Sequence, residues 1–393
     1  MARLGDYIEQ IRGVSYKPED VCTAQDKNSV AILRANNIQD DGLNFDDLIY
    51  VKKSKVSVTQ YIKAGDIVVC ASSGSKNLVG KAAIANKDME ISFGAFCKVV
   101  RPKKLMPSYV GYYFQSPKYR NKISELAGGA NINNIRNEHI DELDIVVLNI
   151  DEQERISVEL DKVCNLISFR KQQLSKLDEL VKARFVELFG DAEHNEKGLP
   201  TSPMTELCEI IDGDRGKNYP KQEEFSEEGF CLFLNAKNVT SNGFSFENCM
   251  YITEEKDKIL RNGKLSRGDV VLTTRGTLGN LAFYDESVPY EHMRINSGMV
   301  ILRMKRDRIT ERFFIEQFKM QLASIKERIA SGSAQPQLPI STMNKIVMLV
   351  PDVELQNQFA VFVEQTDKSK LAIQKSLEKL ETLKKALMQQ YFG

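Results

Sequence analysis

Apolar side chains recur at helical spacing through residues 151–190. Successive members of this stripe lie three, four or seven residues apart, which is the pattern of an amphipathic helix. Asp151 marks a helix start, because its carboxylate can accept hydrogen bonds from the free amides of the first turn. The pattern predicts a helix of ~37 residues, roughly 55 Å long. The stripe consists of Val163, Ile167, Leu174, Leu177, Val181 and Leu188, interrupted by Arg170 and Arg184.

A second stripe of the same kind runs through residues 351–393, and both segments end in Phe-Gly. A helix of this length needs a partner along its stripe, so we expect the two helices to form a coiled coil. Antiparallel packing would hold two globular parts at opposite ends of a rod, related by a pseudo-two-fold axis. Such a rod is comparable to about 15 base pairs of DNA. The second stripe consists of Thr366, Ile373, Leu377, Leu380, Leu383 and Leu387.

The chain contains an internal repeat at an offset of 203 residues. The offset relates residues at the start, in the middle and near the end of two segments of about 190 residues. Chance does not align separate clusters at one offset, so the sequence indicates a duplicated unit, a globular part followed by a long helix. Matched pairs include Leu4 with Leu207, Ile8 with Ile211, Arg12 with Arg215, Gly13 with Gly216, Asp66 with Asp269, and Gln153 with Gln356.

The repeat predicts the domain order. Pro and Gly residues between the copies indicate a linker, and short β-type runs alternate with helical segments in each globular part. We therefore expect an α+β fold with two duplicated lobes of about 150 residues. The expected order is a first lobe at 1–150, a helix at 151–190, a linker at 191–203, a second lobe at 204–350 and a helix at 351–393. Strands are expected at 67–70, 96–100, 145–148, 270–273, 299–302 and 346–350, and helices at 109–126 and 312–329.

Composition excludes several classes of protein. The 54 basic and 54 acidic side chains cancel, so no overall positive field indicates a histone-like coat on nucleic acid. The seven cysteines form no C-x-x-C pair, and their odd number and scattered spacing predict a reducing cytoplasm rather than a disulfide framework. No apolar run approaches 18 residues and no signal-peptide pattern opens the chain, so we expect a protein that is neither exported nor membrane-spanning.

Catalytic and metal-binding motifs are not apparent in the sequence. Residues 74–81 resemble a phosphate-binding loop, but five residues separate Gly74 from Gly80 and Ala82 replaces the Ser or Thr that binds Mg²⁺. The three histidines are too scattered to form a metal set. We find neither a nuclease centre nor the Pro-Pro-aromatic segment of an amino-methyltransferase, and we expect no catalytic residue and no metal on this chain.

Polar loop residues suited to DNA occupy matched positions in the two lobes. Arginine can contact guanine through two hydrogen bonds, and Asn or Gln can contact adenine likewise. Any single residue could instead make a polar turn, but the segments match in position and differ in sequence, as two readers of different half-sites would. The candidates are Arg34, Asn36, Asn37, Ser72, Ser73, Ser75, Lys76, Asn131, Asn133 and Asn134 in the first lobe, and Asn235, Lys237, Asn238, Thr274, Arg275, Thr277, Gln335 and Gln337 in the second.

In this order and in two copies, these features resemble the specificity subunit of type I restriction-modification systems. The resemblance covers the whole chain. It rests on the order lobe, helix, lobe, helix, on the opening motif at 4–8, and on the Gly-Asp turns before residues 67 and 270. It also rests on the polar segment leading to residues 151–156, of which 354–359 is a looser second copy.

The resemblance implies two target recognition domains, each reading a few base pairs of double-stranded DNA, spaced by an antiparallel coiled coil. It implies a subunit that is not itself an enzyme and binds no cofactor. Such a subunit assembles with two methyltransferase subunits, which use S-adenosylmethionine, and with two restriction subunits, which hydrolyse ATP. The alternative is a tandem-repeat coiled-coil scaffold that binds only protein partners. A scaffold would not need divergent Asn, Gln and Arg loops at matched sites, and a self-contained enzyme is disfavoured by the missing catalytic motifs.

Overall fold

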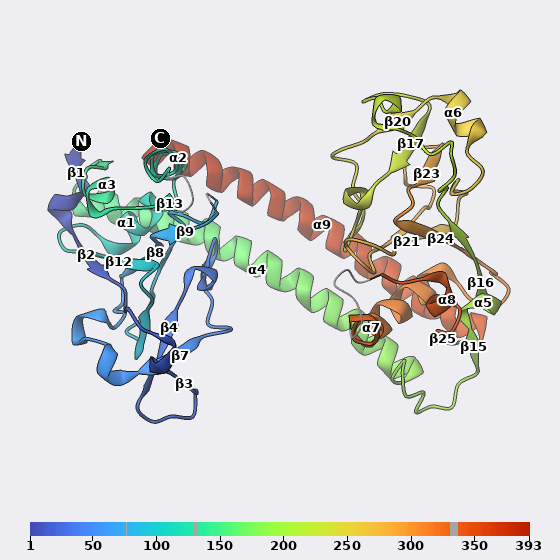
Figure 1. The fold of residues 1–393 in the computed structure, drawn as a ribbon, viewed down its shortest axis with the longest axis horizontal. Helices are drawn as coiled ribbons and strands as arrows, with labels where there is room; N and C mark the ends of the chain where they lie inside the picture. The colour runs from blue at the N-terminus through green and yellow to red at the C-terminus, as the bar shows by residue number, and fades with distance from the viewer. Residues whose placement is uncertain (76, 129–132, 331–336) are drawn as a thin grey trace. The chain divides into compact units, whose positions relative to one another are not determined.

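The chain divides into two compact units in the computed structural model (Figure 1). The structure describes residues 1–75, 77–128, 133–330 and 337–393, with the backbone alone at 328–330. Unit 1 comprises Met1–Gln173 and Ile373–Gly393, and unit 2 comprises Leu174–Ala372. Two long helices, α4 (Ile150–Phe189) and α9 (Val353–Phe392), each contribute one part to each unit. Each unit therefore contains one lobe and a segment of both helices.

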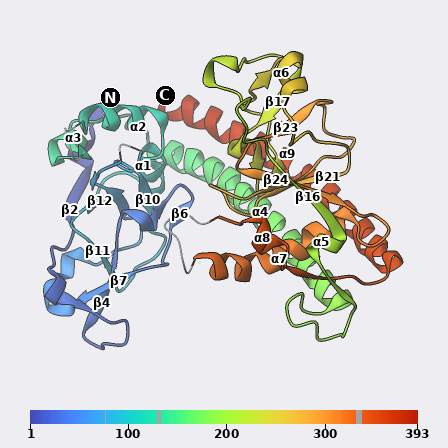
Figure 2. The same cartoon turned by 45° about the vertical axis from the view of Figure 1, so that its right-hand side comes forward.

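Unit 1 is built on an antiparallel sheet with strand order β10-β8-β12-β2. Successive residues of a strand point to opposite faces, so β8 sends Ile67 and Val69 into one core and Val68 and Cys70 into another. The second core is shared with a sheet of order β11-β4-β7-β3, in which β11 and β4 are parallel (Figure 2). These strands are β2 (Ile8–Arg12), β3 (Val21–Cys22), β4 (Ser29–Leu33), β7 (Ile49–Lys52), β8 (Ile67–Cys70), β10 (Ala82–Ile84), β11 (Ile91–Phe93) and β12 (Cys97–Pro102).

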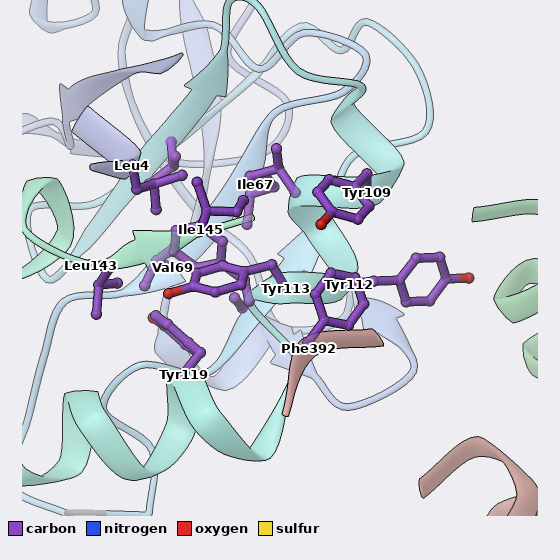
Figure 3. Packing of buried hydrophobic residues seen from close by; sticks show 14 of the residues in the cluster. Leu4, Ile67, Val69, Tyr109, Tyr112, Tyr113, Tyr119, Leu143, Ile145 and Phe392 are labelled. Atoms are coloured by element: carbon purple, nitrogen blue, oxygen red, sulfur yellow. The ribbon is translucent and has the colours of Figure 1, made fainter. Parts of the chain in front are cut away.

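Aromatic side chains join the end of α9 to the first lobe (Figure 3). Tyr109 on α1 (Pro107–Tyr113) packs on Phe392, with the ring centroids 5.1 Å apart. Tyr113 lies 6.3 Å from the same ring, edge to face. Leu387 of α9 belongs to the same buried cluster. The core of unit 1 is therefore completed by residues far along the chain.

The helix expected at 109–126 is interrupted, which corrects that prediction. Pro117 has no amide hydrogen and restricts the residue before it, so a helix cannot run through it undisturbed. Ser116 instead caps a second helix, α2 (Pro117–Leu126), by accepting a hydrogen bond from the amide of Tyr119 at 3.2 Å. In unit 2 the corresponding segment lacks this proline and forms one helix, α7 (Glu311–Ala330).

Unit 2 repeats the same architecture. Its main sheet has order β16-β24-β21-β22, and its smaller sheet has order β20-β17-β23, with β17 and β23 parallel. Under α7, Phe185 of α4 stacks on Phe313 at 5.6 Å and meets Phe359 of α9 edge to face at 5.6 Å. The strands are β16 (Cys208–Asp212), β17 (Cys231–Leu234), β20 (Tyr251–Ile252), β21 (Asp269–Thr273), β22 (Leu281–Phe283), β23 (Met293–Ile295) and β24 (Met299–Met304).

The duplication is confirmed, but its register is not uniform. The Leu4 amide donates to the Leu143 carbonyl at 2.8 Å, and the equivalent bond in unit 2 runs from Met204 to Ile346 at 2.9 Å. Leu4 therefore corresponds to Met204, and the predicted match of Leu4 with Leu207 is wrong by three residues. The strand register shows the same shift, so the predicted matches of Ile8 with Ile211 and of Arg12 with Arg215 are also wrong. Loops of unequal length change the offset along each lobe, which surface loops tolerate. The offset of 203 does hold for Asp66 with Asp269 and for Gln153 with Gln356, which are described next.

Two buried polar contacts recur in both units. Asp66 receives two hydrogen bonds from the guanidinium of Arg101, at 2.7 and 2.8 Å, and Asp269 receives two from Arg303, at 2.9 and 2.8 Å. These bonds raise the pKa of both arginines. Each pair joins the Gly-Asp turn that starts one strand, β8 or β21, to the strand beside it.

The second recurring contact joins each long helix to its lobe. The side chain of Gln153 accepts from the Met106 amide at 2.9 Å and donates to the Leu148 carbonyl at 2.8 Å. Gln356 accepts from the Thr310 amide at 2.8 Å and donates to the carbonyls of Pro351 and Arg308. Both glutamines are almost fully buried. They fix where α4 and α9 leave the lobes.

Segments of α4 and α9 pack antiparallel within each unit. In unit 1 the Tyr391 hydroxyl donates to Glu159 at 2.6 Å, and in unit 2 the Lys370 ammonium lies 2.6 Å from Asp178. Early residues of α4 thus meet late residues of α9, and late residues of α4 meet early residues of α9. The predicted fold class is confirmed: mixed α/β lobes with two long helices.

The inward positions of the helices follow a three-four alternation, with one correction. Each residue turns a helix by about 100°, so Lys384 occupies the inward position and the neighbouring Leu383 faces outward, 45% exposed. The prediction that Leu383 lies in the interface is therefore wrong. Of the other predicted members, Val163, Val181, Thr366, Leu377 and Leu387 are buried, and Ile167, Leu174, Leu177, Leu188, Ile373 and Leu380 are half-buried.

The remaining elements are short. The segment expected to be a linker ends in a strand, β15, which pairs with β25. The short strands are β1 (Ala2–Arg3), β5 (Ile38–Gln39), β6 (Gly42–Leu43), β9 (Ser72–Ser73), β13 (Asn133–Asn134), β14 (Asp144–Ile145), β15 (Thr201–Pro203), β18 (Val239–Thr240), β19 (Gly243–Phe244) and β25 (Val347–Leu349). The short helices are α3 (Asn137–Asp141), α5 (Met204–Leu207), α6 (Glu254–Ile259) and α8 (Ile340–Met343).

Candidate nucleic-acid interface

Two predicted loops that are distant in sequence meet at one point in each unit. In unit 1 the amides of Ala71 and Ser72 donate to the carbonyl of Phe96, and the Ala71 carbonyl accepts from Ile135 at 2.8 Å. In unit 2 the amides of Thr274 and Arg275 donate to Gly298, and the Thr274 carbonyl accepts from Leu338 at 3.1 Å. The two backbones therefore make the same connections. Ser72 and Arg275 occupy equivalent positions, as the sequence predicts.

The unit 1 site consists of a hydroxyl and an amide. Strand β9 pairs with β13, which places Asn134 opposite Ser72, and the Ser72 hydroxyl donates to Asn134 Oδ1 at 2.6 Å. Asn134 is exposed, whereas Asn133 on the same strand is buried because adjacent residues of a strand face opposite sides. The Asn133 amide points inward and donates to the Ser73 carbonyl. Asn133 is therefore unavailable to a base, and its prediction as a DNA contact is wrong.

The unit 2 site is cationic. A cavity of 240 Å³ is lined by Arg275 and Gln337 together with Arg215 and Asp212. Arg215 is held by Asp212 at 3.1 Å and by the carbonyl of Ser297 at 3.2 Å. The Arg275 side chain is exposed and makes neither a hydrogen bond nor an ion pair with any other described residue. Within the described part of the chain, nothing therefore occupies its guanidinium group.

A wider groove of 740 Å³ adjoins this cavity through the loop after Arg275. Thr277 lines the groove from that loop, Lys237 lines it from the loop before β18, and Lys326 lines it from α7. Both lysines are exposed, and neither ammonium group pairs with a described carboxylate. The groove thus gathers positive charge next to the Arg275 site.

The loops at 34–37 and 235–238 are held by buried asparagines, which changes their interpretation. Asn37 Oδ1 accepts from the Arg34 amide at 2.8 Å, and Asn238 Oδ1 accepts from the Asn235 amide at 2.9 Å. Their amide nitrogens donate to backbone carbonyls of the following turn. Both side chains are about 1% exposed. Asn37 and Asn238 therefore shape their loops, and they are unavailable to a base.

Other candidates are divided by their local partners. The Arg34 guanidinium is paired with Asp47 at 2.6 Å, which neutralises much of its charge. Thr274 is buried and donates to Gly298, whereas Ser75 and Thr277 are exposed and Ser73 is half-buried. Asn36 is exposed beside the Arg34 pair. Lys76, Asn131 and Gln335 lie outside the described residues.

Glycines allow helices to press against the two recognition loops. Gly80 and Gly279 have positive φ angles of 78° and 89°, and their amides donate to Cys70 and Thr273 at the strand ends. A Cβ atom would lie 2.6 Å from Ile123 at Gly80 and 2.5 Å from Leu322 at Gly279. Since no side chain fits there, α2 and α7 lie directly under the loops.

Sequence reasoning missed two lining residues, Arg215 and Lys326. The repeat at offset 203 pairs Arg215 with Arg12, and this pairing does not indicate a DNA contact at the end of β16. Lys326 falls within the predicted helix at 312–329, where a lysine is ordinary. The signal for both is spatial, because each reaches a recognition loop only in the folded lobe.

The described residues contain free thiols and no gathered set of metal ligands. The cysteines are free thiols, and burial raises the pKa of Cys70 to about 11 and of Cys208 to about 12. Within the described ranges, no three His, Cys, Asp or Glu side chains gather as metal ligands. Neither α4 nor another described helix combines the length and apolarity needed to cross a bilayer.

Comparison with known proteins identifies the family. The model described as the type I restriction modification DNA specificity domain matches residues 2–179 and, a second time, residues 197–385. This chain belongs to that family. Each match runs from a lobe into the long helix that follows it, so the duplicated unit defined by the repeat is the family's domain.

Named relatives agree with this assignment. The StySPI specificity subunit of Salmonella potsdam is 40% identical over 173 residues, which cover 44% of this chain and 37% of that protein. The EcoKI specificity subunit of Escherichia coli K12 is 29% identical over 378 residues, covering 90% and 79%.

Solved structures show the same fold. The S subunit of a type I restriction-modification system from M. genitalium matches with a TM-score of 0.58 at 19% identity, covering 100% of this chain and 95% of that one. A chain from a structural study of type I R-M complex assembly and conformational transition matches with a TM-score of 0.51 at 13% identity, covering 98% and 97%.

Proposed function

We propose that this chain is the DNA-reading subunit of a type I restriction-modification complex. The lobe of unit 1 reads one part of a bipartite site, and the lobe of unit 2 reads the other. The observation that carries the proposal is the pair of equivalent loop sites at Ser72 and Arg275. One backbone frame presents two different sets of polar side chains, which suits two half-sites of different sequence.

Charge supports a DNA ligand at the unit 2 site. Arg275, Lys237 and Lys326 are exposed cations without described partners, and they line neighbouring cavities. Phosphate contacts position a protein on DNA, and base contacts give specificity. The zero net charge of the chain fits a subunit whose partners supply part of the phosphate contact.

The proposed partners are two methyltransferase subunits, which bring S-adenosylmethionine, and two restriction subunits, which bring ATP hydrolysis; this chain contributes no catalytic group. Exposed apolar side chains at matched helix positions support a partner that binds twice. Val158 and Val361 are 43% and 54% exposed, and Leu180 and Leu383 are 48% and 45% exposed. Native mass spectrometry of the assembled complex tests this stoichiometry, and a single methyltransferase copy per chain would contradict it.

Methylome sequencing tests the function directly. Deleting this chain from its host should abolish methylation at one bipartite sequence, and restoring the chain should restore it. Substituting Lys237 and Lys326 together with Ala should lower methylation of that sequence, because two phosphate contacts are lost. A methylome that does not change on deletion would refute the proposal.

The scaffold alternative predicts a different binding result. A protein that binds only proteins should not shift a DNA fragment carrying the target, even when methyltransferase is present. We expect a shift that requires both this chain and the methyltransferase. The shift should weaken as salt is raised from 50 to 200 mM, because released counterions drive phosphate binding.

A further inference from the structure

We propose that Ser72 and Asn134 of unit 1 read an adenine in one half-site. At the equivalent point of the other half-site, Arg275 of unit 2 reads a guanine. This inference rests on the proposed function and names the chemistry of its two sites. It follows from one backbone frame that presents unlike side chains, so the difference lies in what the side chains can bond.

The backbone equivalence comes first. Ser72 and Arg275 each donate from the main chain to the loop before β12 or β24, and the residue before each accepts from the segment that carries Asn134 or Gln337. Each side chain therefore starts from the same point of its lobe. A DNA half-site docked in the same way on both lobes would present equivalent base pairs to these two positions.

In unit 1 the Ser72 hydroxyl holds the exposed amide group of Asn134 by a hydrogen bond. The Ser72 hydroxyl donates to Asn134 Oδ1 at 2.6 Å, which holds the exposed amide in position. The amide keeps a second lone pair on Oδ1 and both hydrogens on Nδ2. Adenine offers an N6 donor and an N7 acceptor in the major groove, which matches this pair. Guanine offers two acceptors and leaves Oδ1 facing an acceptor.

In unit 2 the side chain is a guanidinium that pairs with none of the residues that the structure describes. Arg275 has no described partner, whereas the neighbouring Arg215 is restrained by Asp212. A planar guanidinium can donate two parallel hydrogen bonds to O6 and N7 of guanine. It cannot match adenine in this way, because adenine presents a donor at N6. Arg275 is therefore suited to base reading.

The test uses the complex of this chain with its methyltransferase partner and reads every methylated sequence in genomic DNA. Asn134→Ala should relax one adenine position in one half of the site, and Arg275→Ala should relax one guanine position in the other half. Each relaxation should be about fivefold to 150-fold in preference, from about 1–3 kcal/mol per bidentate contact. The rest of the site and its gap should not change.

Arg275→Lys separates base reading from phosphate binding. Lysine keeps the charge but loses the planar fork, and it can still contact guanine. A base contact at this position should therefore relax partly with Lys and more with Ala, whereas a phosphate contact should leave the base preference unchanged with Lys. Lys221→Ala removes an exposed cation of unit 2 that lies outside both cavities, and it should leave the motif unchanged.

Three results overturn the inference. Arg275→Ala could lower methylation equally on all sequences, the Asn134 and Arg275 variants could relax positions in the same half, or neither could relax any position although the wild-type complex methylates its site. Co-purification of each variant with the methyltransferase confirms folding. A wild-type complex that methylates no site refutes the proposed function instead, so the two failures are distinguishable.

Discussion

Unit 1 and unit 2 keep the same internal contacts and differ in what they expose. Both units contain an Asp–Arg pair at the strand that follows the Gly-Asp turn. Both also contain a buried glutamine near the start of a long helix. At the equivalent loop position one unit carries a serine and the other an arginine. The difference indicates that packing held the duplicated frame constant while the surface was free to change.

One internal difference stands out in the main sheet. Strand pairing places Lys98 of β12 opposite Val69, and Val300 of β24 opposite Leu272, so a buried lysine in unit 1 corresponds to a valine in unit 2. The Lys98 ammonium donates to Gln10 at 3.0 Å and to Asn137 at 2.9 Å. Burial lowers the pKa of Lys98 to about 8. Unit 1 therefore contains a titrating group that unit 2 lacks.

The largest expected effect concerns the buried glutamines. Gln356→Leu should destabilise unit 2 by about 3–5 kcal/mol, because the Thr310 amide and two carbonyls lose their partner. Gln153→Leu should destabilise unit 1 by about 2–4 kcal/mol, because fewer groups are left unpaired. Amide hydrogen exchange should rise in the unit that carries the change. Gln365→Leu, on the exposed face of α9, is the control, and equal loss of protection in both units would contradict the assignment.

The Asp–Arg pairs should follow, with a difference between units. Asp66→Asn should cost about 2–4 kcal/mol, because Arg101 is left largely buried without its charge partner. Asp269→Asn should cost less, since the Arg303 side chain is 40% exposed against 20% for Arg101. Chemical unfolding of both variants, monitored by hydrogen exchange in each unit, measures this order. A larger loss of stability in Asp269→Asn than in Asp66→Asn would contradict this prediction.

The corrected helix stripe gives a smaller, sharper contrast. Leu387→Ala should destabilise unit 1 by about 2–3 kcal/mol, because the side chain is buried against the first lobe. Leu383→Ala should cost less than about 0.5 kcal/mol, because that side chain faces solvent. Thermal unfolding of the two variants compares them directly. Equal losses would restore Leu383 to the interface.

The smallest expected effect is the pH dependence introduced by Lys98. Its pKa is lowered by folding, from 10.5 to about 8, so the unfolded chain holds the proton more tightly between these values. The free energy of unfolding of unit 1 should therefore rise with pH in this window, by about 1–2 kcal/mol relative to Lys98→Met. Urea unfolding at pH 7.5 and pH 10 tests this. A difference between the two proteins that does not change with pH would refute it.

Much of the fold could be predicted because it depends on periodicity. The stripes along α4 and α9 and the strand at 67–70 follow directly from apolar spacing, and the duplication follows from matched residues such as Gln153 and Gln356. The register at Leu4 could not be predicted, because loop lengths that shift it leave no periodic trace. Leu383 was misplaced because Lys384, a polar residue, holds the inward position.

The candidate site could be predicted only in part. The sequence identified Ser72 and Arg275 as equivalent, since each follows a recognisable strand. It could not distinguish Asn134 from Asn133, or Asn36 from Asn37, because neighbouring polar residues differ only in the direction that folding gives them. Lys326 joins the site through the packing of α7, a contact that local sequence does not encode.

The packing of Phe392 against Tyr109 and Tyr113 has a consequence for biosynthesis. Residues 1–173 leave the ribosome before the last turns of α9 have been synthesised. The apolar surface of the first lobe that packs on Phe392 therefore stays uncovered until the whole of unit 2 has been translated. A nascent chain that stalls within unit 2 exposes that apolar surface to chaperones and proteases. Unit 1 can thus complete its hydrophobic core only after unit 2 has been synthesised.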